Sequence, residues 1–249
     1  MIVSIGSDPS SRPTSENPNN SATVSTHLVI FARNPKPGTV KTRLHSRYTP
    51  DQAAAIYRAF IRDTVNAAKK VNVDRRCVAC DPPGSEAELA VLTGPGWVLF
   101  PQVSADLGER MYRAARHCFD LGAGRVVILG TDVPSLPPHH VDRAFELLQE
   151  HEIVLGPSMD GGYYLVGLAR PLHEIFRDIA WSTEHVFRQT LERVRALRLT
   201  AGFLPSWYDV DTPEQLDHLV DDTRAHLQAG MADPIPHTRA CLPTLDCLA

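Results

Sequence analysis

Residues 125–132 have the sequence RVVILGTD, and this short stretch decides how the surrounding chain is interpreted. Its apolar positions are consecutive rather than alternating, which is typical of a strand covered by helices on both faces of a sheet. The stretch ends in Thr131 and Asp132 and is followed by VPSLPP. It therefore predicts the central strand of an α/β domain, with polar side chains at its carboxyl end.

Predicted strands and helices alternate on either side of this stretch. Strands are predicted at residues 27–33, 75–81, 97–102, 125–132, 152–158, 162–169 and 199–205. Helices are predicted at residues 49–71, 85–94, 106–122, 137–151, 182–198 and 209–220. This alternation predicts an α/β fold with a mostly parallel, mixed sheet and helices on both faces. In such sheets ligands bind beyond the carboxyl ends of the strands, where the strand order reverses.

Helix starts are indicated by capping residues. Thr49 is a predicted N-cap, and Thr212 with Gln215 forms a predicted capping box. Ser85 with Glu88 predicts another capping box.

The two ends of the chain lack this alternation. Residues 1–25 are rich in Ser, Pro and Asn, which predicts a disordered tail. Residues 230–249 are punctuated by proline and show neither a helical nor a strand period, which predicts a C-terminal tail. A single domain is therefore expected at residues 26–229.

Composition excludes several classes of protein. The net charge of -4 argues against a general nucleic-acid binder, whose affinity depends on neutralising many phosphates. No apolar run approaches the roughly 18–20 residues that span a bilayer, and the N-terminus lacks the features of a secretory signal. We expect a cytoplasmic protein with no nucleic-acid or membrane partner.

Five cysteines are present, and Cys77 and Cys80 form a CxxC pair. This pair lies in a predicted strand, where a spacing of three residues points the two thiols to opposite faces of the sheet. No second CxxC follows to complete a zinc site. Buried, reduced thiols are therefore expected instead of a redox or metal site.

The first predicted strand leads into a loop that gathers cations. Residues 32–44 have the sequence ARNPKPGTVKTRL on a chain of negative net charge. Two prolines stiffen the loop and a glycine permits close approach, neither of which a merely solvated basic surface requires. The loop therefore predicts a binding site for a nucleotide phosphate chain, with candidate residues Arg33, Lys36, Gly38, Lys41 and Arg43.

Carboxylates follow three other predicted strands. Asp132 ends the central strand, Asp160 precedes two glycines, and Asp209 and Asp211 lie in WYDVDTP. Gathered on one edge of the sheet, they are expected to hold Mg²⁺ or Mn²⁺, which binds one or two carboxylates together with phosphate oxygens. Asp160 suits a turn equally well. Asp209 and Asp211 face the same side of an extended chain, and Asp211 is preferred as the ligand.

Other polar and aromatic residues give weaker indications. His139 and His140 begin a helix and are expected on the surface, because adjacent histidines on a helix cannot both face one metal. Trp207, Tyr163 and Tyr164 border the carboxylates and either stack on a base or sugar ring or pack in the core.

Six motifs occur in a fixed order: FARNPKPGTVKTRL, DLGERM, GTDVPSL, GPSMDGGYYLVGL, WST and DVDTPEQL. With these motifs the chain resembles a glycosyltransferase-A-fold family, whose members are associated with arsenosugar biosynthesis or with radical-SAM selenodomain proteins. The resemblance spans Thr26 to Ala229. It implies a nucleotide-diphospho-sugar transferase fold, in agreement with the predicted sheet.

More distantly, KTRL, DVPSL, DGG and DVDTPEQL are similar to phospholactate and molybdenum-cofactor guanylyltransferases. This similarity implies that Lys36, Lys41 and Arg43 bind phosphates and that Asp132 is the principal metal ligand, with Asp160 or Asp211 completing the site. The segment from Gln102 to Arg110 would lie near the base or ribose, and its candidate residues are Gln102, Asp106 and Gly108. The glycine-rich first loop of many nucleotidyltransferases is absent.

Three hypotheses for function follow. The first is a metal-dependent glycosyltransferase that passes a sugar from a nucleotide sugar to a small-molecule acceptor, with Lys41 stabilising the departing diphosphate and Asp160 orienting or deprotonating the acceptor hydroxyl. The second is a nucleotidyltransferase that uses a nucleoside triphosphate and releases pyrophosphate. The third is a nucleotide-binding domain without turnover.

Overall fold

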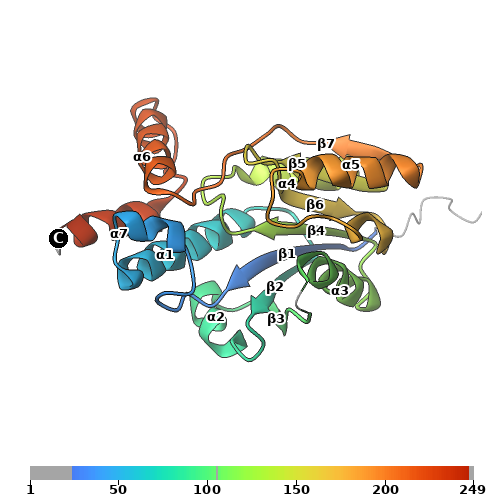
Figure 1. Ribbon diagram of the computed structural model, residues 1–249, viewed down its shortest axis with the longest axis horizontal. Coiled ribbons are helices and arrows are strands. Elements are labelled where there is room, and N and C mark those ends of the chain that lie inside the picture. Colours follow the sequence, from blue (N-terminus) through green and yellow to red (C-terminus); the bar gives the residue numbers. More distant parts are fainter. Residues whose placement is uncertain (1–23, 105, 247–249) are drawn as a thin grey trace, which may run out of the picture.

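The structure is a computed structural model that describes residues 24–104 and 106–246 (Figure 1). Its seven-stranded sheet has the order β3-β2-β1-β4-β6-β5-β7. The strands are β1 Thr26–Arg33, β2 Arg75–Asp81, β3 Val98–Pro101, β4 Arg125–Gly130, β5 Ile153–Pro157, β6 Tyr163–Leu168 and β7 Ala201–Phe203. Strand β6 is antiparallel to β4 and β5, whereas the other pairs are parallel. The predicted mostly parallel, mixed sheet is confirmed.

Helices cover both faces of the sheet (Figure 1). They are α1 Pro50–Ala68, α2 Glu86–Thr93, α3 Leu107–Asp120, α4 Pro138–Leu147, α5 Val186–Ala196, α6 Pro213–Gln228 and α7 Pro236–Asp246, with 3-10 helices η1 Thr42–Ser46 and η2 Glu174–Phe176. One core layer lies between the sheet and α1, α2 and α4, and the other lies between the sheet and α3, α5 and η2. Cys77 and Cys80 belong to opposite layers, as the strand spacing predicts.

The N-caps predicted at Thr49 and Thr212 are confirmed, and both helices begin with a complete capping box. The box predicted at Ser85 is wrong. The Ser85 hydroxyl points back to the carbonyl of Pro82, to which it donates at 2.6 Å, and it accepts no hydrogen bond from the first turn of α2.

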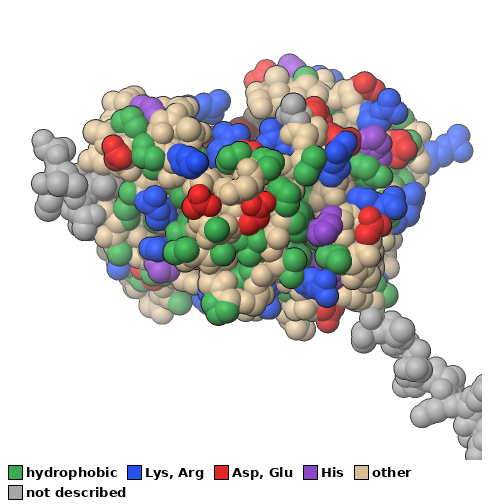
Figure 2. All heavy atoms as spheres, turned by 90° about the horizontal axis from the view of Figure 1, so that it is seen from below, with side chains coloured by type: hydrophobic (Ala, Val, Ile, Leu, Met, Phe, Trp, Pro, Cys, Tyr) green, Lys and Arg blue, Asp and Glu red, His purple; other side chains and the backbone are tan. Residues whose placement is uncertain are grey.

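The surface carries mixed charge. On the face shown in Figure 2, acidic, basic and hydrophobic side chains alternate over short distances. Within the described residues, no helix combines the length and the apolar composition required to cross a bilayer.

The C-terminal segment contains a helix where a tail is expected. The Asp63 carboxylate, buried in α1, accepts hydrogen bonds from the amide of His237 at 2.9 Å and from the amide and hydroxyl of Thr238 at 2.9 and 2.7 Å. Ile235 just before α7 is fully buried. These contacts pack α7 on α1 (Figure 1). The sequence of residues 230–249 has no helical period that would predict this helix, whose first turn is held by a distant carboxylate instead.

The tail predicted at residues 1–25 lies almost entirely outside the described residues.

Replacing Asp63 by alanine is expected to lower the free energy of unfolding by about 2–4 kcal/mol, because buried donors on α7 lose their acceptor. Urea unfolding measures this change. Arg62→Ala, at an exposed position on the same helix, is the control and should change the free energy by less than about 0.5 kcal/mol. Equal stability of the Asp63→Ala and Arg62→Ala proteins would show that α7 does not depend on this carboxylate.

Candidate active site

A cleft of about 470 Å³ opens at the carboxyl ends of β1, β2 and β4. Residues from distant loops meet there, as expected from the rule for parallel sheets. Of the predicted nucleotide-binding, metal-binding and catalytic residues, six line the cleft: Arg33, Lys41, Arg43, Gln102, Asp132 and Asp211. The aromatic residues Tyr163 and Tyr164 line it as well.

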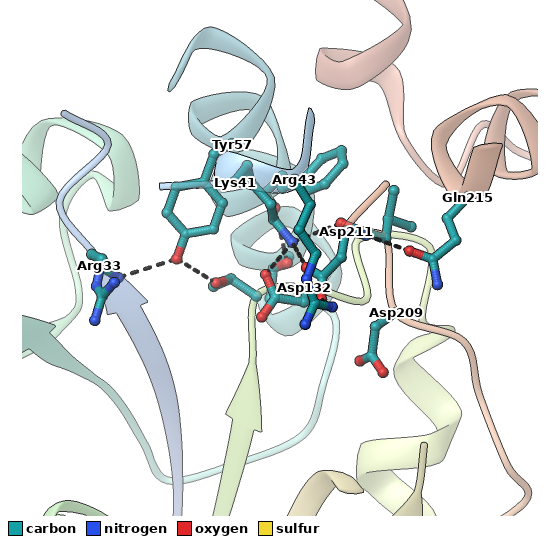
Figure 3. A network of polar contacts seen from close by, with 12 residues as sticks. Arg33, Lys41, Arg43, Tyr57, Asp132, Asp209, Asp211 and Gln215 are labelled. Atoms are coloured by element: carbon teal, nitrogen blue, oxygen red, sulfur yellow. Dashed lines mark hydrogen bonds and ion pairs between the residues drawn. The ribbon is translucent and has the colours of Figure 1, made fainter. Parts of the chain in front are cut away.

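Lys41 lies at the centre of the site (Figure 3). Its ammonium is 2.5 Å from Asp132 Oδ1 and 2.8 Å from Asp211 Oδ1, and it donates to the carbonyl of Val210 at 2.7 Å. The basic loop and two of the three carboxylate segments therefore converge on one atom. All three donors of the ammonium are directed at protein oxygens, and the side chain is only 4% exposed. A phosphate reaches Lys41 only after one of these contacts opens.

The surroundings of Lys41 keep it charged. Burial alone would lower the pKa of its ammonium, but Asp132 and Asp211 outweigh burial and raise the pKa above its usual value. The ammonium also lies 5.8 Å from the centre of the Tyr57 ring and 5.4 Å from that of Phe60, within cation–π range. Lys41 has a left-handed backbone with φ of 46°, which is strained for a residue with a side chain. The fold thus holds Lys41 in an unfavourable conformation to direct its ammonium at the acids.

Asp209 lies next to this group (Figure 3). The pKa of Asp209 is raised to about 7, chiefly by burial and further by the charges of Asp160, Asp132 and Asp211, against the lowering effect of the hydrogen bond from Ser158. Burial is the main cause, and the three nearby carboxylates add to it.

Arginines form the exposed lip of the cleft. Arg43 is 73% exposed, with Nη1 3.6 Å from Asp211 Oδ2. Arg33 pairs with Asp81 at 2.7 Å, and Arg110 lies 3.4 Å from the other oxygen of the same carboxylate. The guanidinium groups of Arg33 and Arg43 are accessible to a phosphate in a way that Lys41 is not, whereas Arg110 is largely buried.

Four predicted nucleotide contacts, together with Asp160, are not among the described lining residues. Lys36 and Gly38 are exposed in the loop. Asp106 caps α3 by accepting from the amide of Glu109 at 2.8 Å. The exposed Asp160 accepts from the amide of Gly162 at 2.9 Å, which is the turn role expected as its alternative.

Gly108 is required for packing. A Cβ at this position would lie 2.6 Å from Cζ2 of Trp181 and 2.7 Å from the carbonyl oxygen of Phe176. Helix propensity alone predicts that Gly108→Ala stabilises α3 by about 1 kcal/mol. The structure predicts the opposite: overpacking is expected to destabilise the protein by about 1–3 kcal/mol, measured by urea unfolding. A variant more stable than the parent would contradict this packing.

Tyr57 belongs to the site but was not singled out in the sequence. Tyr57 shares a 2.8 Å hydrogen bond with Thr131 and accepts from the amide of Arg33 at 3.2 Å, which ties α1 to the ends of β1 and β4. Burial, and then the charge of Asp132, raise the pKa of Tyr57. No capping, turn or strand-end signal marks Tyr57 in the sequence, because it lies within the predicted helix at residues 49–71.

The prediction for the two histidines is half correct. His139 is exposed, but His140 is buried, with its ring 5.1 Å from that of Trp207 in an edge-on contact. Helix α4 turns His140 inward because its first turn packs on the segment that carries Trp207.

The donor set fits a divalent cation. Among the described residues, no three carboxylates bring oxygens within 4.8 Å of one another, so a closed cage of three carboxylates is not formed. Asp132 and Asp211 do converge, and Mg²⁺ commonly binds one or two carboxylates and completes its coordination with phosphate oxygens and water.

Comparison with known proteins identifies the family. A protein from Desulfovibrio desulfuricans G20, assigned as a nucleotide-diphospho-sugar transferase, is 33% identical, with a TM-score of 0.78 over 90% of this chain and 96% of that one. Residues 64–183 match the family described as an uncharacterized protein conserved in bacteria (DUF2064). The chain belongs to the same family as this Desulfovibrio protein.

Two further proteins widen the comparison. The 2-phospho-L-lactate guanylyltransferase of Methanocaldococcus infernus is 24% identical over 183 residues, which cover 72% of this chain and 78% of the relative. A Mycobacterium tuberculosis H37Rv protein, solved in complex with manganese, is 18% identical, with a TM-score of 0.50 over 80% of this chain and 98% of that one. The latter similarity establishes a shared fold.

Proposed function

We propose that this protein is a metal-dependent glycosyltransferase that uses a nucleotide-sugar donor and a small-molecule acceptor. The observation that carries the proposal is the convergence of Asp132, Asp211 and Lys41 beneath a lip of arginines. An arginine lip above paired carboxylates suits a diphosphate bound together with a divalent cation. The 33% identical nucleotide-diphospho-sugar transferase supports this class of donor.

Each part of the cleft has a role in the proposal. Asp132 and Asp211 would hold Mg²⁺ or Mn²⁺, which supplies positive charge against the departing nucleoside diphosphate. Arg33 and Arg43, exposed at the lip, bind the phosphates. Lys41 positions the two carboxylates and adds positive charge beneath the diphosphate.

The donor and acceptor occupy different parts of this arrangement. Gln102, buried at the end of β3, lines the side of the cleft proposed for the base, and its amide nitrogen donates to the carbonyl of Ala79 at 2.9 Å. Asp160 does not line the cleft itself, but its charge acts on the neighbouring Asp209, and it is proposed to orient or deprotonate an acceptor hydroxyl that binds beyond the carboxylates. The narrower resemblance to arsenosugar and selenodomain-associated glycosyltransferases supports a small acceptor.

A second candidate is nucleotidyl transfer. The specific observation in its favour is the 24% identity to a guanylyltransferase over 72% of this chain. In this reaction the same arginines and carboxylates would bind a triphosphate, and pyrophosphate would depart instead of a nucleoside diphosphate.

A product assay separates the two reactions. The purified protein is incubated with a panel of nucleotide sugars or nucleoside triphosphates, Mg²⁺ or Mn²⁺, and a mixture of candidate acceptors. The proposal expects a nucleoside diphosphate to be released, and only with a divalent cation present. Release of pyrophosphate from a triphosphate would favour the second candidate. Nucleotide binding without either product would contradict both.

A further inference from the structure

A second hollow, of about 910 Å³, lies apart from the cleft. Its walls are the end of α1, the start of α4, one side of α6 and the segment at residues 231–236. The linings of the hollow and the cleft share no residue. The volume lies in the range of small-molecule sites, roughly 300–1,000 Å³.

Apolar and aromatic side chains dominate the wall of the hollow. The rings of Trp207 and Tyr208 are stacked, with centres 5.9 Å apart and planes inclined by 10°. The apolar residues around them are Ala67, Leu136, Pro137, Pro138, Ala225, Met231, Ala232, Pro234 and Pro236. A wall of this kind favours a planar or apolar molecular body over water.

The charged residues of the hollow select a negative group. Lys69 and Lys70 are exposed at the end of α1, and neither forms an ion pair within the described part of the chain. Of the two acids in the lining, Asp233 pairs with Arg239 at 2.9 Å, whereas Asp222 accepts from the neutral Tyr208 hydroxyl at 2.9 Å and keeps its charge. His139 and His226 add further donors. Two lysines without ion pairs, against one carboxylate that no described lysine or arginine pairs, leave the lining with a small excess of positive charge.

The hollow is directly linked to the active site by two short segments. Ser135 in its lining follows Asp132 by three residues, and Tyr208 directly precedes Asp209. The two segments are joined where the amide of Val210 donates to the carbonyl of Asp132 at 2.9 Å. A molecule that presses on Trp207 and Tyr208 therefore acts on the backbone that places the carboxylates.

From these observations we propose that the hollow is a second binding site, for a small anionic molecule with an aromatic or apolar body. Its occupant binds outside the nucleotide cleft and stabilises the segments that carry the carboxylates. This site does not depend on which reaction the cleft performs.

Two fluorescent probes test the site. 1-Anilinonaphthalene-8-sulfonate has an aromatic body and a sulfonate, whereas N-phenyl-1-naphthylamine has nearly the same body without the charge. Titration of the folded protein is expected to give one sulfonate site per chain, with at least tenfold tighter binding than for the neutral probe. Equal affinities would overturn the anionic part of the proposal, and several weak sites would overturn the site itself.

Variants locate the probe. Ala225→Trp fills the hollow and is expected to weaken sulfonate binding at least tenfold, with Met231→Trp as a second filling variant from a loop. Lys70→Glu should weaken binding about threefold to tenfold. Arg62→Glu, an equal charge change at an exposed position of α1 outside the lining, is the control and should change the affinity less than twofold. Melting curves establish that each variant is folded.

Two results would contradict the proposed second site. Binding that is unchanged in both folded filling variants, or abolished by Asp132→Asn, would place the probe elsewhere. Failure of the product assay leaves this result untouched, because the probe titration requires no turnover.

Discussion

Asp132→Asn is expected to lower transfer activity on the order of 100-fold or more, with the fold retained. Asparagine keeps the size of the side chain and removes the charge that pairs with Lys41 at 2.5 Å and that would hold the cation. A 100-fold loss corresponds to about 2.7 kcal/mol of transition-state stabilisation. Nucleotide binding should lose its dependence on Mg²⁺ or Mn²⁺, which calorimetry with and without the metal measures directly.

The control for this variant is Asp221→Asn. Asp221 lies on the exposed side of α6, where it pairs with Arg224 at 2.6 Å, and its loss should leave activity and metal dependence unchanged. Full metal-dependent binding in Asp132→Asn would refute the assignment of Asp132. A protein that no longer melts cooperatively would instead show that the carboxylate is needed for the fold, which contradicts the expectation of a retained structure.

Lys41→Met is expected to reduce activity on the order of 100-fold and also to destabilise the protein. Removing one partner of a buried ion pair costs roughly 3–5 kcal/mol. A smaller loss, about 2 kcal/mol, is expected because Asp132 and Asp211 remain partly hydrated. For a chain of this size the melting temperature should fall by about 4–8 °C.

Mn²⁺ should reverse part of that loss. Without the ammonium the two carboxylates repel each other, and a divalent cation relieves the repulsion, so Mn²⁺ should raise the melting temperature of Lys41→Met more than that of the parent. Lys36→Met changes an exposed lysine of the same loop and should melt like the parent. An identical response to Mn²⁺ in all three proteins would show that Lys41 does not act on the metal ligands.

Much of the fold was predictable because strands covered on both faces have continuous apolar sequences. The stretch VVILG lies within β4 at the centre of the sheet, and the caps at Thr49 and Thr212 begin α1 and α6 as expected. Helix α7 was not predicted, because its first turn depends on Asp63 and not on a periodic pattern of its own. Ser85 shows the same limit, since its hydroxyl bonds backward to Pro82 and not forward into the helix.

The site was predictable to the level of segments. The rule that ligands bind at the carboxyl ends of strands brought the basic loop, Asp132 and Asp211 to one place. It did not predict that Lys41 is occupied by the carboxylates, because that depends on a left-handed backbone at a residue other than glycine. Nor did it reveal that Gly108 contacts Trp181 and not a ligand, since this requires knowing how two distant segments pack.

The hydrogen bonds between Asp63 on α1 and the first turn of α7 have a consequence for biosynthesis. Asp63 and Thr238 are 175 residues apart, and a chain made from its N-terminus produces α1 long before α7. Until residues 236–246 leave the ribosome, the carboxylate of Asp63 lacks the hydrogen-bond donors that it has in the folded chain. The emergence of these residues is thus the event that completes the burial of this carboxylate.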